Sequence, residues 1–231
     1  MKPRPVLVRL LWVVTFLLAA IGVVVVIRRI LQLSAPSPAR PAAPELADAD
    51  FLRHRLLTTL HIVPGLLFMI LGPLQFMRSL RNRHLRLHRW IGRVFLACGL
   101  VIGTTALVMS PQMSIGGVNE TVATMLFGLV FLFDLVKAYL SIRRRDVARH
   151  REWMIRAFAI GLAVATIRPI VGAFFATRRM TQLTPHDFFG AAFWLGFTLH
   201  LIAAESWIDY TRTIAVPASR SSVAVRDGAP G

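Results

Sequence analysis

The sequence contains a single cysteine, Cys98, which lies inside a long apolar run. It therefore offers neither a disulfide nor a set of thiolate metal ligands. Acidic residues are also scarce, with 11 Asp and Glu against 27 Lys and Arg, and charged residues make up only 16% of the chain. We find no Ser/His/Asp arrangement, no glycine-rich phosphate loop and no zinc-ligand spacing. These shortages exclude a disulfide scaffold and give no support to the chemistry of common soluble enzymes.

Long apolar runs are abundant: hydrophobic residues make up 55% of the chain, and the mean hydropathy is +0.61. About 20 helical residues cross a bilayer core of roughly 30 Å. Six runs reach about that length, and they are continuous, without the alternation that a β-barrel requires. The sequence therefore predicts an all-α, six-transmembrane-helix bundle, with spans near Val6–Ile27, Leu56–Met77, Trp90–Met109, Thr121–Ser141, Trp153–Phe175 and Phe188–Ile208.

The basic residues gather at one side of the predicted bundle. The stretch from Arg78 to Arg93 holds six arginines and no acid, and a second basic stretch runs from Lys137 to Arg156. An excess of Lys and Arg in loops marks the cytoplasmic side, so we expect a bacterial cytoplasmic (inner) membrane protein with both termini in the cytoplasm. The Arg-rich loops would then contact anionic lipid headgroups. Charge placed in this way, without a reading element, argues against a nucleic-acid partner.

Composition divides the chain into four parts. The first apolar run ends in Arg28 and Arg29 rather than in a small-residue cleavage site, so we interpret it as a retained anchor. A segment rich in Ala and Pro follows, and the chain ends in a small, polar stretch. The predicted parts are a transmembrane anchor (1–32), an outer linker (33–54), a five-helix membrane core (55–210) and a disordered cytoplasmic tail (211–231).

Two short stretches repeat each other. One begins His88-Arg89-Trp90 and continues to Arg93 and Phe95, and the other begins His150-Arg151-Glu152-Trp153 and continues to Arg156 and Phe158. Each opens a long apolar segment that follows another apolar segment. The repeat predicts two related helical hairpins, closed by one further helix, with a histidine of each hairpin at the same water–lipid boundary.

Two histidines at one depth on alternate helices could serve as the ligands of a b-type haem, so His88 and His150 are candidate ligands of a haem iron. Arg93 and Arg156 follow them and could pair with propionates. Two other interpretations remain open. The same residues suit interfacial anchoring to lipid, and the paired helix N-termini suit an anion or a quinone headgroup.

A second group of polar residues lies nearer the opposite side of the membrane. His61 and Arg168 are predicted at similar depth, which suggests an anionic or carbonyl-bearing ligand such as a quinone or a haem propionate. Alternatively, Arg168 extends outward to the membrane surface or pairs with Glu120, and His61 bonds to a backbone carbonyl.

The remaining intramembrane polar residues are expected to satisfy one another. Asp134 and Lys137, three residues apart on one helix, are predicted to neutralise each other. Glu205 is predicted to meet Arg93 or Arg156, and His200 to form a hydrogen bond between helices.

The combined motifs resemble the bacterial predicted membrane protein family labelled domain of unknown function 2306, over roughly Leu56 to Ile208. The residues that match the family pattern are His61, Gly72-Pro73-Leu74-Gln75-Phe76, His88, Arg93, His150, Arg156 and Arg168. The resemblance implies a multi-pass membrane protein with no assigned activity. At the level of architecture the chain is also similar to di-haem cytochrome b ferric and ascorbate reductases, which carry a histidine on each of four consecutive helices. Because Ala123 occupies the place where a partner for His61 would fall, that similarity implies one haem at most.

The leading functional hypothesis is therefore a membrane protein that binds a redox cofactor, b-type haem or quinone, within the bundle. Gln75 joins His61, His88, Arg93, His150, Arg156 and Arg168 as a candidate binding residue. An assembly or interaction subunit of a respiratory membrane complex, with a membrane protein partner, is the first alternative. A small-molecule or proton-coupled transporter is the second, with Arg168 holding an anionic substrate and Asp134 or Glu205 exchanging protons.

Overall fold

A computed structural model of the chain describes residues 4–34, 51 and 53–215. Within them the chain forms seven helices: α1 (Pro5–Ser34), α3 (Arg55–Phe76), α4 (Arg78–Arg83), α5 (Leu85–Met113), α6 (Gly117–Arg143), α7 (Val147–Thr181) and α8 (Pro185–Ala215). All except the six-residue α4 are long and apolar enough to cross a membrane. The predicted all-α bundle with six candidate spans is confirmed.

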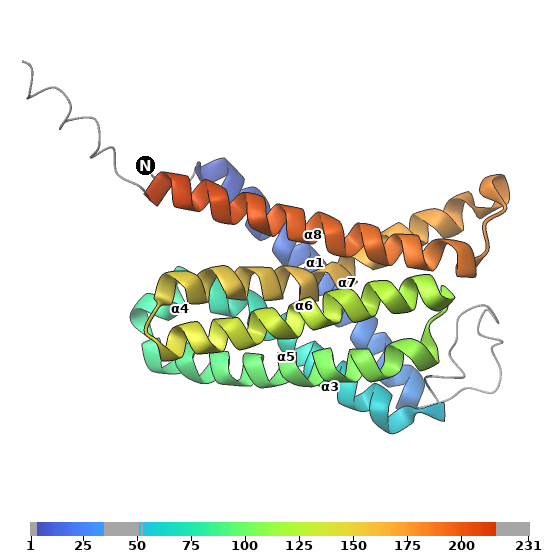
Figure 1. Cartoon of the computed structure of the whole chain (residues 1–231), viewed down its shortest axis with the longest axis horizontal. Coiled ribbons are helices and arrows are strands. Elements are labelled where there is room, and N and C mark those ends of the chain that lie inside the picture. Colours follow the sequence, from blue (N-terminus) through green and yellow to red (C-terminus); the bar gives the residue numbers. More distant parts are fainter. Residues whose placement is uncertain (1–3, 35–50, 52, 216–231) are drawn as a thin grey trace, which may run out of the picture.

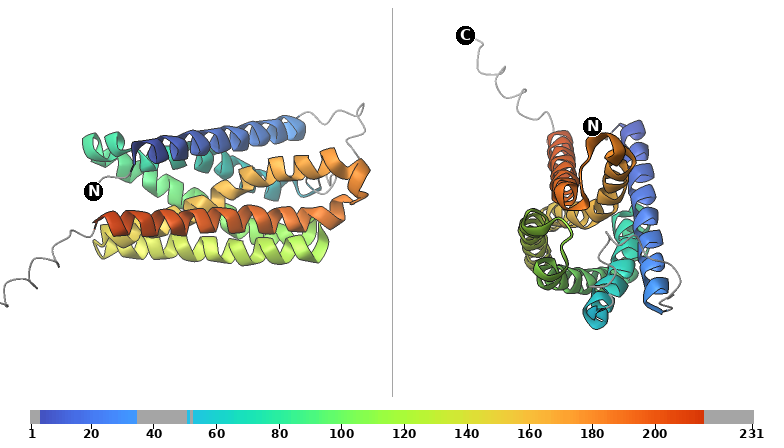
Figure 2. Two further views of the ribbon diagram at one scale, coloured as in Figure 1. Left: turned by 90° about the horizontal axis from the view of Figure 1, so that it is seen from above. Right: turned by 90° about the vertical axis from the view of Figure 1, so that its right-hand side faces the viewer.

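The helices pack mainly in chain order (Figures 1 and 2). Helix α5 packs against α3 and α6, while α7 packs against α6 and α8, so α5 and α7 lie on either side of α6. Helix α8 also contacts α6, and α1 lies against α3 and α7. A ring of α1, α3, α5, α6 and α7 results, with α8 laid over α6 and α7.

One end of the bundle, which we name the basic end, holds α4, the α6–α7 turn and the last turns of α8 (Figure 1). The start of α1 lies there as well, since the Arg4 backbone N–H donates to Tyr210 Oη at 3.2 Å. Asp146 caps α7, because its side chain accepts from the Arg149 backbone N–H at 3.0 Å. The Arg-rich stretches of the sequence therefore converge on one end.

Aromatic rings fill the middle of the bundle. Phe68 and Phe95 are fully buried and stack with their ring centroids 4.2 Å apart. Phe158 from α7 completes the cluster, with its centroid 6.0 Å from that of Phe68 and 6.2 Å from that of Phe95. Glycines permit this close packing: a Cβ on Gly72 would lie 2.1 Å from Phe158, and one on Gly161 would lie 2.5 Å from Phe68.

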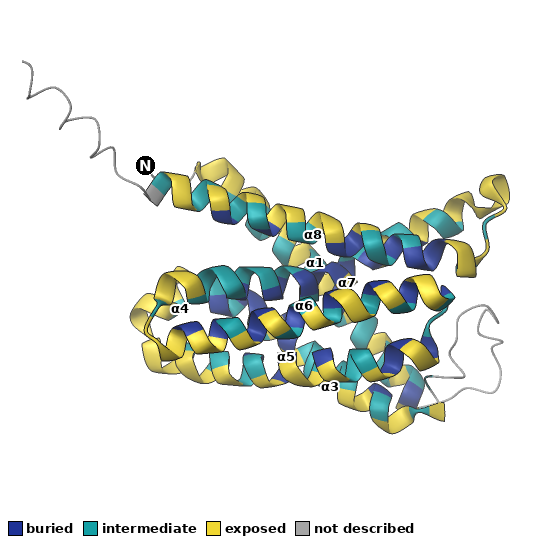
Figure 3. Ribbon diagram, in the orientation of Figure 1, coloured by how far each residue is buried: buried dark blue, intermediate teal, exposed yellow. Residues whose placement is uncertain are grey.

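The extent to which a helix is buried depends on its place in the bundle (Figure 3). Helix α1 has the most apolar span, of mean hydropathy 3.0, yet only 11% of that span is buried. A membrane helix with so much exposed apolar surface faces lipid along most of its length. It touches the bundle through small residues, since Ala19 is buried and Gly22 lies beside Met69.

Two predicted parts of the chain fall largely outside the described residues. The expected linker at 33–54 begins within α1, whose last residue is Ser34, and residues 35–50 and 52 are not described. The expected tail at 211–231 begins within α8, which continues to Ala215, and residues 216–231 are not described.

Candidate polar sites at the two ends of the bundle

The two repeated histidines occupy equivalent places in their helices. His88 is the fourth residue of α5 and His150 the fourth residue of α7, and both helices begin at the basic end. Each side chain is half-buried, and the two are close enough to interact electrostatically. The equal depth that the repeat predicts is therefore present.

The imidazole of His150 is held by a backbone carbonyl. Its Nδ1 lies 2.9 Å from the carbonyl oxygen of Ala138 on α6. A carbonyl only accepts, so Nδ1 carries the hydrogen and donates it. In the neutral ring, Nε2 then keeps its lone pair, which is the arrangement of many metal-ligating histidines.

The imidazole of His88 lacks such a contact. Its Nδ1 is buried and has no hydrogen-bond partner in the part of the chain that the structure describes. Gln75 from α3 reaches the backbone at the same place, because its Nε2 donates to the His88 carbonyl at 3.4 Å. The Gln75 side chain lies over Gly92, where an added Cβ would be 3.1 Å from Oε1. Gln75 therefore positions the start of α5, whereas the His88 ring keeps an unused nitrogen.

The surroundings of this histidine pair are basic on one side and apolar on the other. Arg81 and Arg89 lie within electrostatic range of His88. Toward the middle of the bundle, Phe95 and Phe158 follow the two histidines by seven and eight residues, or about 10–12 Å along the helices. The aromatic cluster thus closes the bundle beneath the pair.

Arg93 and Arg156, the predicted propionate partners, are not gathered around the pair. Arg93 is exposed on α5. Arg156 forms a bidentate pair with Glu205 of α8, in which Nε lies 2.5 Å from Oε1 and the terminal nitrogen 2.8 Å from Oε2. The guanidinium also lies over the Trp153 ring, 4.7 Å from its centroid. The prediction that Glu205 meets one of these two arginines is confirmed for Arg156.

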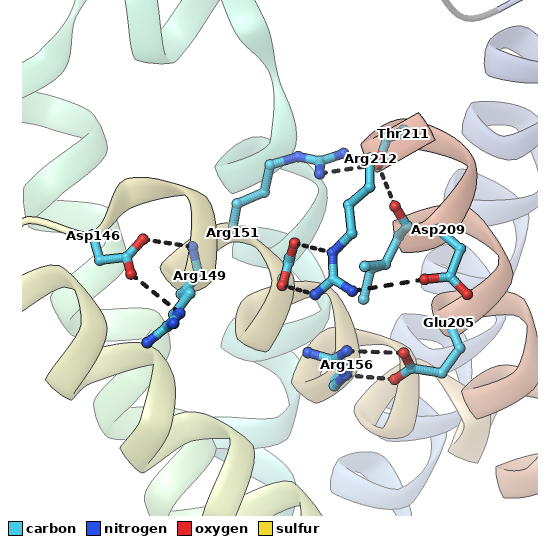
Figure 4. Close-up of polar contacts among 10 residues, drawn as sticks. Asp146, Arg149, Arg151, Arg156, Glu205, Asp209, Thr211 and Arg212 are labelled. Atoms are coloured by element: carbon cyan, nitrogen blue, oxygen red, sulfur yellow. Dashed lines mark hydrogen bonds and ion pairs between the residues drawn. The ribbon is translucent and has the colours of Figure 1, made fainter. Parts of the chain in front are cut away.

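Further polar contacts join α7 to α8 at the basic end (Figure 4). Arg212 forms a bidentate ion pair with Glu152, and Arg151 donates to Thr211 Oγ1 at 3.2 Å. These contacts are not among those predicted from the sequence. Glu152 is the only acid within the two repeated stretches, and that exception could have indicated a structural partner.

Asp134 is the most buried ionisable residue of this end. It is 2% exposed, and its Oδ2 has no hydrogen-bond partner among the described residues. The predicted neutralisation by Lys137 is wrong: the ammonium lies 5.8 Å from the Phe133 ring centroid and 5.7 Å from that of Trp153. A cation over aromatic faces is satisfied without a carboxylate. Asp134 instead interacts electrostatically with the nearby Arg156–Glu205 pair.

At the opposite end, His61 and Arg168 do come near each other, within electrostatic range. His61 Nδ1 lies 2.9 Å from Thr105 Oγ1 of α5. The Arg168 side chain is exposed and has no hydrogen bond or ion pair with the described residues. Glu120 forms no ion pair with it in the described part of the chain and interacts with it only at longer electrostatic range, while its Oε2 accepts from the Gly116 backbone N–H at 2.7 Å.

His200 forms the predicted hydrogen bond between helices. Its Nε2 lies 2.7 Å from Thr166 Oγ1, which joins α8 to α7. His200 is thus accounted for by a hydrogen bond that joins two helices, and it is not part of either polar group described above.

These features define a class: the chain is a multi-pass helical membrane protein with polar groups at both ends of its bundle. The model of the family described as predicted membrane protein (DUF2306) matches residues 58–208. That match covers more than half of the chain, so the chain belongs to this family. No curated protein and no solved structure matches the chain.

Proposed function

We propose that this protein binds one b-type haem at the basic end, between His88 of α5 and His150 of α7, and that this end faces the cytoplasm. The observation that carries the proposal is the unpaired, buried Nδ1 of His88 within electrostatic range of a second histidine at the same depth. Buried polar atoms are nearly always hydrogen-bonded or bound to a metal, so this nitrogen calls for a partner.

The donor set fits the group. His88 and His150 come from helices on either side of α6, and their imidazole nitrogens would hold the haem iron. His150 already has its Nδ1 hydrogen directed at Ala138, which leaves Nε2 as the donor atom. Arg81 and Arg89 lie near His88 and would bind the carboxylates of the propionates. The rings of Phe95 and Phe158 supply an apolar boundary.

Haem bound in this place supplies reversible one-electron transfer. Gln75 and the Ala138 carbonyl would keep the two helix starts in position while the charge of the centre changes. Arg81 and Arg89 near His88 would stabilise negative charge on a group held at this site. We therefore propose an electron-transfer role at the cytoplasmic face of the bacterial inner membrane.

The test is an absorption spectrum of the detergent-purified protein, oxidised and then reduced with dithionite, with haem quantified per chain. We expect a Soret band, reduced b-type peaks and about one haem per chain. His88→Ala and His150→Ala should each lose the low-spin spectrum. His84→Ala is the matched control, since His84 is an exposed histidine at the same end whose side chain caps neither adjacent helix. A colourless protein from haem-replete cells overturns the proposal.

A second candidate function, proton-coupled transport, is favoured by Asp134. A nearly fully buried carboxylate with a free oxygen, beside an ion pair, is a typical proton-binding group in transporters. The unpaired Arg168 near the other end would then meet an anionic substrate. Uptake of labelled anions into vesicles under an imposed pH gradient tests this function. If the protein is such a transporter, Asp134→Asn should abolish uptake without changing the thermal stability of the protein.

A further inference from the structure

A groove runs along the elbow where α3 ends, α4 turns aside and α5 begins. It has a volume of about 350 Å³. Its lining includes Met77, Leu80, Arg83, His84, Leu87 and Ile91. The backbone makes the elbow by leaving the helical conformation twice, at Met77 with ψ 120° and at His84 with φ −131°. Between these residues α4 has only six residues, too short to cross the membrane.

The floor of the groove is apolar and the rim is basic. Leu87 and Ile91, four residues apart on α5, form one wall, and Leu87 is 50% exposed. Arg83 and His84 stand at the rim, and both are exposed. Apolar surface open to the outside at the end of a membrane helix lies where acyl chains meet headgroups.

The charge of the elbow selects the headgroup. The stretch from Arg78 to Arg93 contains six arginines and no acid. A zwitterionic lipid would bring its own ammonium into this field without a carboxylate to receive it. A lipid with net negative charge brings a phosphate, which guanidinium groups bind through paired N–H donors.

We propose that this groove is a binding site for one anionic phospholipid, with an acyl chain along Leu80, Leu87 and Ile91 and the phosphate beside Arg83. The site does not depend on haem, because its lining residues exclude His88 and His150. It extends from the end of α3 across α4 to the first two turns of α5, so a bound lipid would join α4 to α5 from outside the bundle.

Native mass spectrometry of the full-length protein in detergent tests the proposal. The probes are dioleoylphosphatidylglycerol and dioleoylphosphatidylcholine, which have the same acyl chains. We expect the first adduct of the anionic lipid at lower concentration than that of the zwitterionic lipid. Arg83→Gln should weaken the anionic adduct by about fivefold, the value of one basic residue near an anionic lipid.

Two further variants make the result decisive. Arg144→Gln removes the same charge at the same end, in the α6–α7 turn and outside the groove, and should change the affinity by less than about twofold. Leu87→Trp fills the groove without changing the charge and should weaken the adducts of both lipids. Equal binding of the two lipids by the wild type, or equal effects of Arg83→Gln and Arg144→Gln, overturns the proposal. An unchanged melting temperature shows that each variant is folded.

Discussion

Arg156 of α7 and Glu205 of α8 meet in a two-pronged ion pair, with the arginine side chain 14% exposed and the glutamate side chain 43% exposed. The pair joins two helices through residues that are 49 positions apart in the chain. Each partner holds the other in a region where an isolated charge is expensive.

The first prediction concerns this pair. Arg156→Ala should lower the free energy of unfolding by about 1–2 kcal/mol, less than for a fully enclosed pair because Glu205 is partly exposed. The double variant Arg156→Ala, Glu205→Ala should lose less than the sum of the single variants. Thermal unfolding in detergent measures the effects.

The control for this cycle is an exposed ion pair of the same end. Arg149 and Asp146 lie 3.4 Å apart, with side chains 75% and 38% exposed. Arg149→Ala should therefore change the stability by less than about 0.5 kcal/mol. Equal losses at positions 149 and 156 would show that the buried geometry contributes nothing.

The second prediction concerns helix packing at Gly72. A Cβ at this position would lie 2.1 Å from Phe158 Cε2, so Gly72→Ala should destabilise the protein by about 1–3 kcal/mol. Phe158→Leu in the same chain should restore part of the loss. Gly172→Ala is the control, because no atom lies within 4 Å of its added Cβ. That variant should be neutral or slightly stabilising, by up to about 1 kcal/mol. Equal melting temperatures of Gly72→Ala and Gly172→Ala would contradict the prediction.

The third prediction concerns Asp134, whose buried carboxylate keeps one oxygen without a partner. Asp134→Leu replaces it with an apolar side chain of similar size and should raise the stability by about 1 kcal/mol or more. A residue that costs stability where it stands is kept for another reason, which here would be proton binding. A fall in melting temperature would instead identify Asp134 as a structural partner of the Arg156–Glu205 pair.

The fourth prediction tests the structural role of His200. Thr166→Val keeps the shape of the side chain but removes the hydroxyl that lies 2.7 Å from His200 Nε2. We expect a loss of about 1 kcal/mol, as for other hydrogen bonds between membrane helices. Thr166→Ser retains the hydroxyl and should lose less. Any haem spectrum should be unaffected in both variants.

The number and order of the membrane helices could be predicted from the sequence, whereas their ends could not. The predicted span Trp153–Phe175 is the centre of a helix that runs from Val147 to Thr181. Hydropathy detects the stretch of a helix that lies within the hydrocarbon core of the membrane. Polar residues such as Arg151 and Arg178 continue the helix beyond that stretch. Helix α4 was missed because six residues rich in arginine carry no apolar period.

The candidate site was predictable where sequence repetition fixes depth and unpredictable where side chains choose between partners. The repeat placed His88 and His150 at one level, because depth follows from position along a helix. The spacing of Asp134 and Lys137 predicts an ion pair, but the Lys137 ammonium lies over the rings of Phe133 and Trp153 instead. Trp153 comes from another helix, so no local pattern could indicate that competition.

The unequal lengths of the helices have a consequence for the surrounding bilayer. Helix α3 has 22 residues and α7 has 35, which correspond to about 33 Å and about 52 Å. A helix of about 33 Å matches a hydrocarbon core of roughly 30 Å, whereas a helix of about 52 Å must tilt, bend, thicken the bilayer locally or extend into water. The membrane should therefore keep its ordinary thickness beside α3 and be equally thick or thicker beside α7. A protein with such an asymmetric rim would favour neighbours of matching hydrophobic thickness on each side, and would orient them around itself without any specific contact.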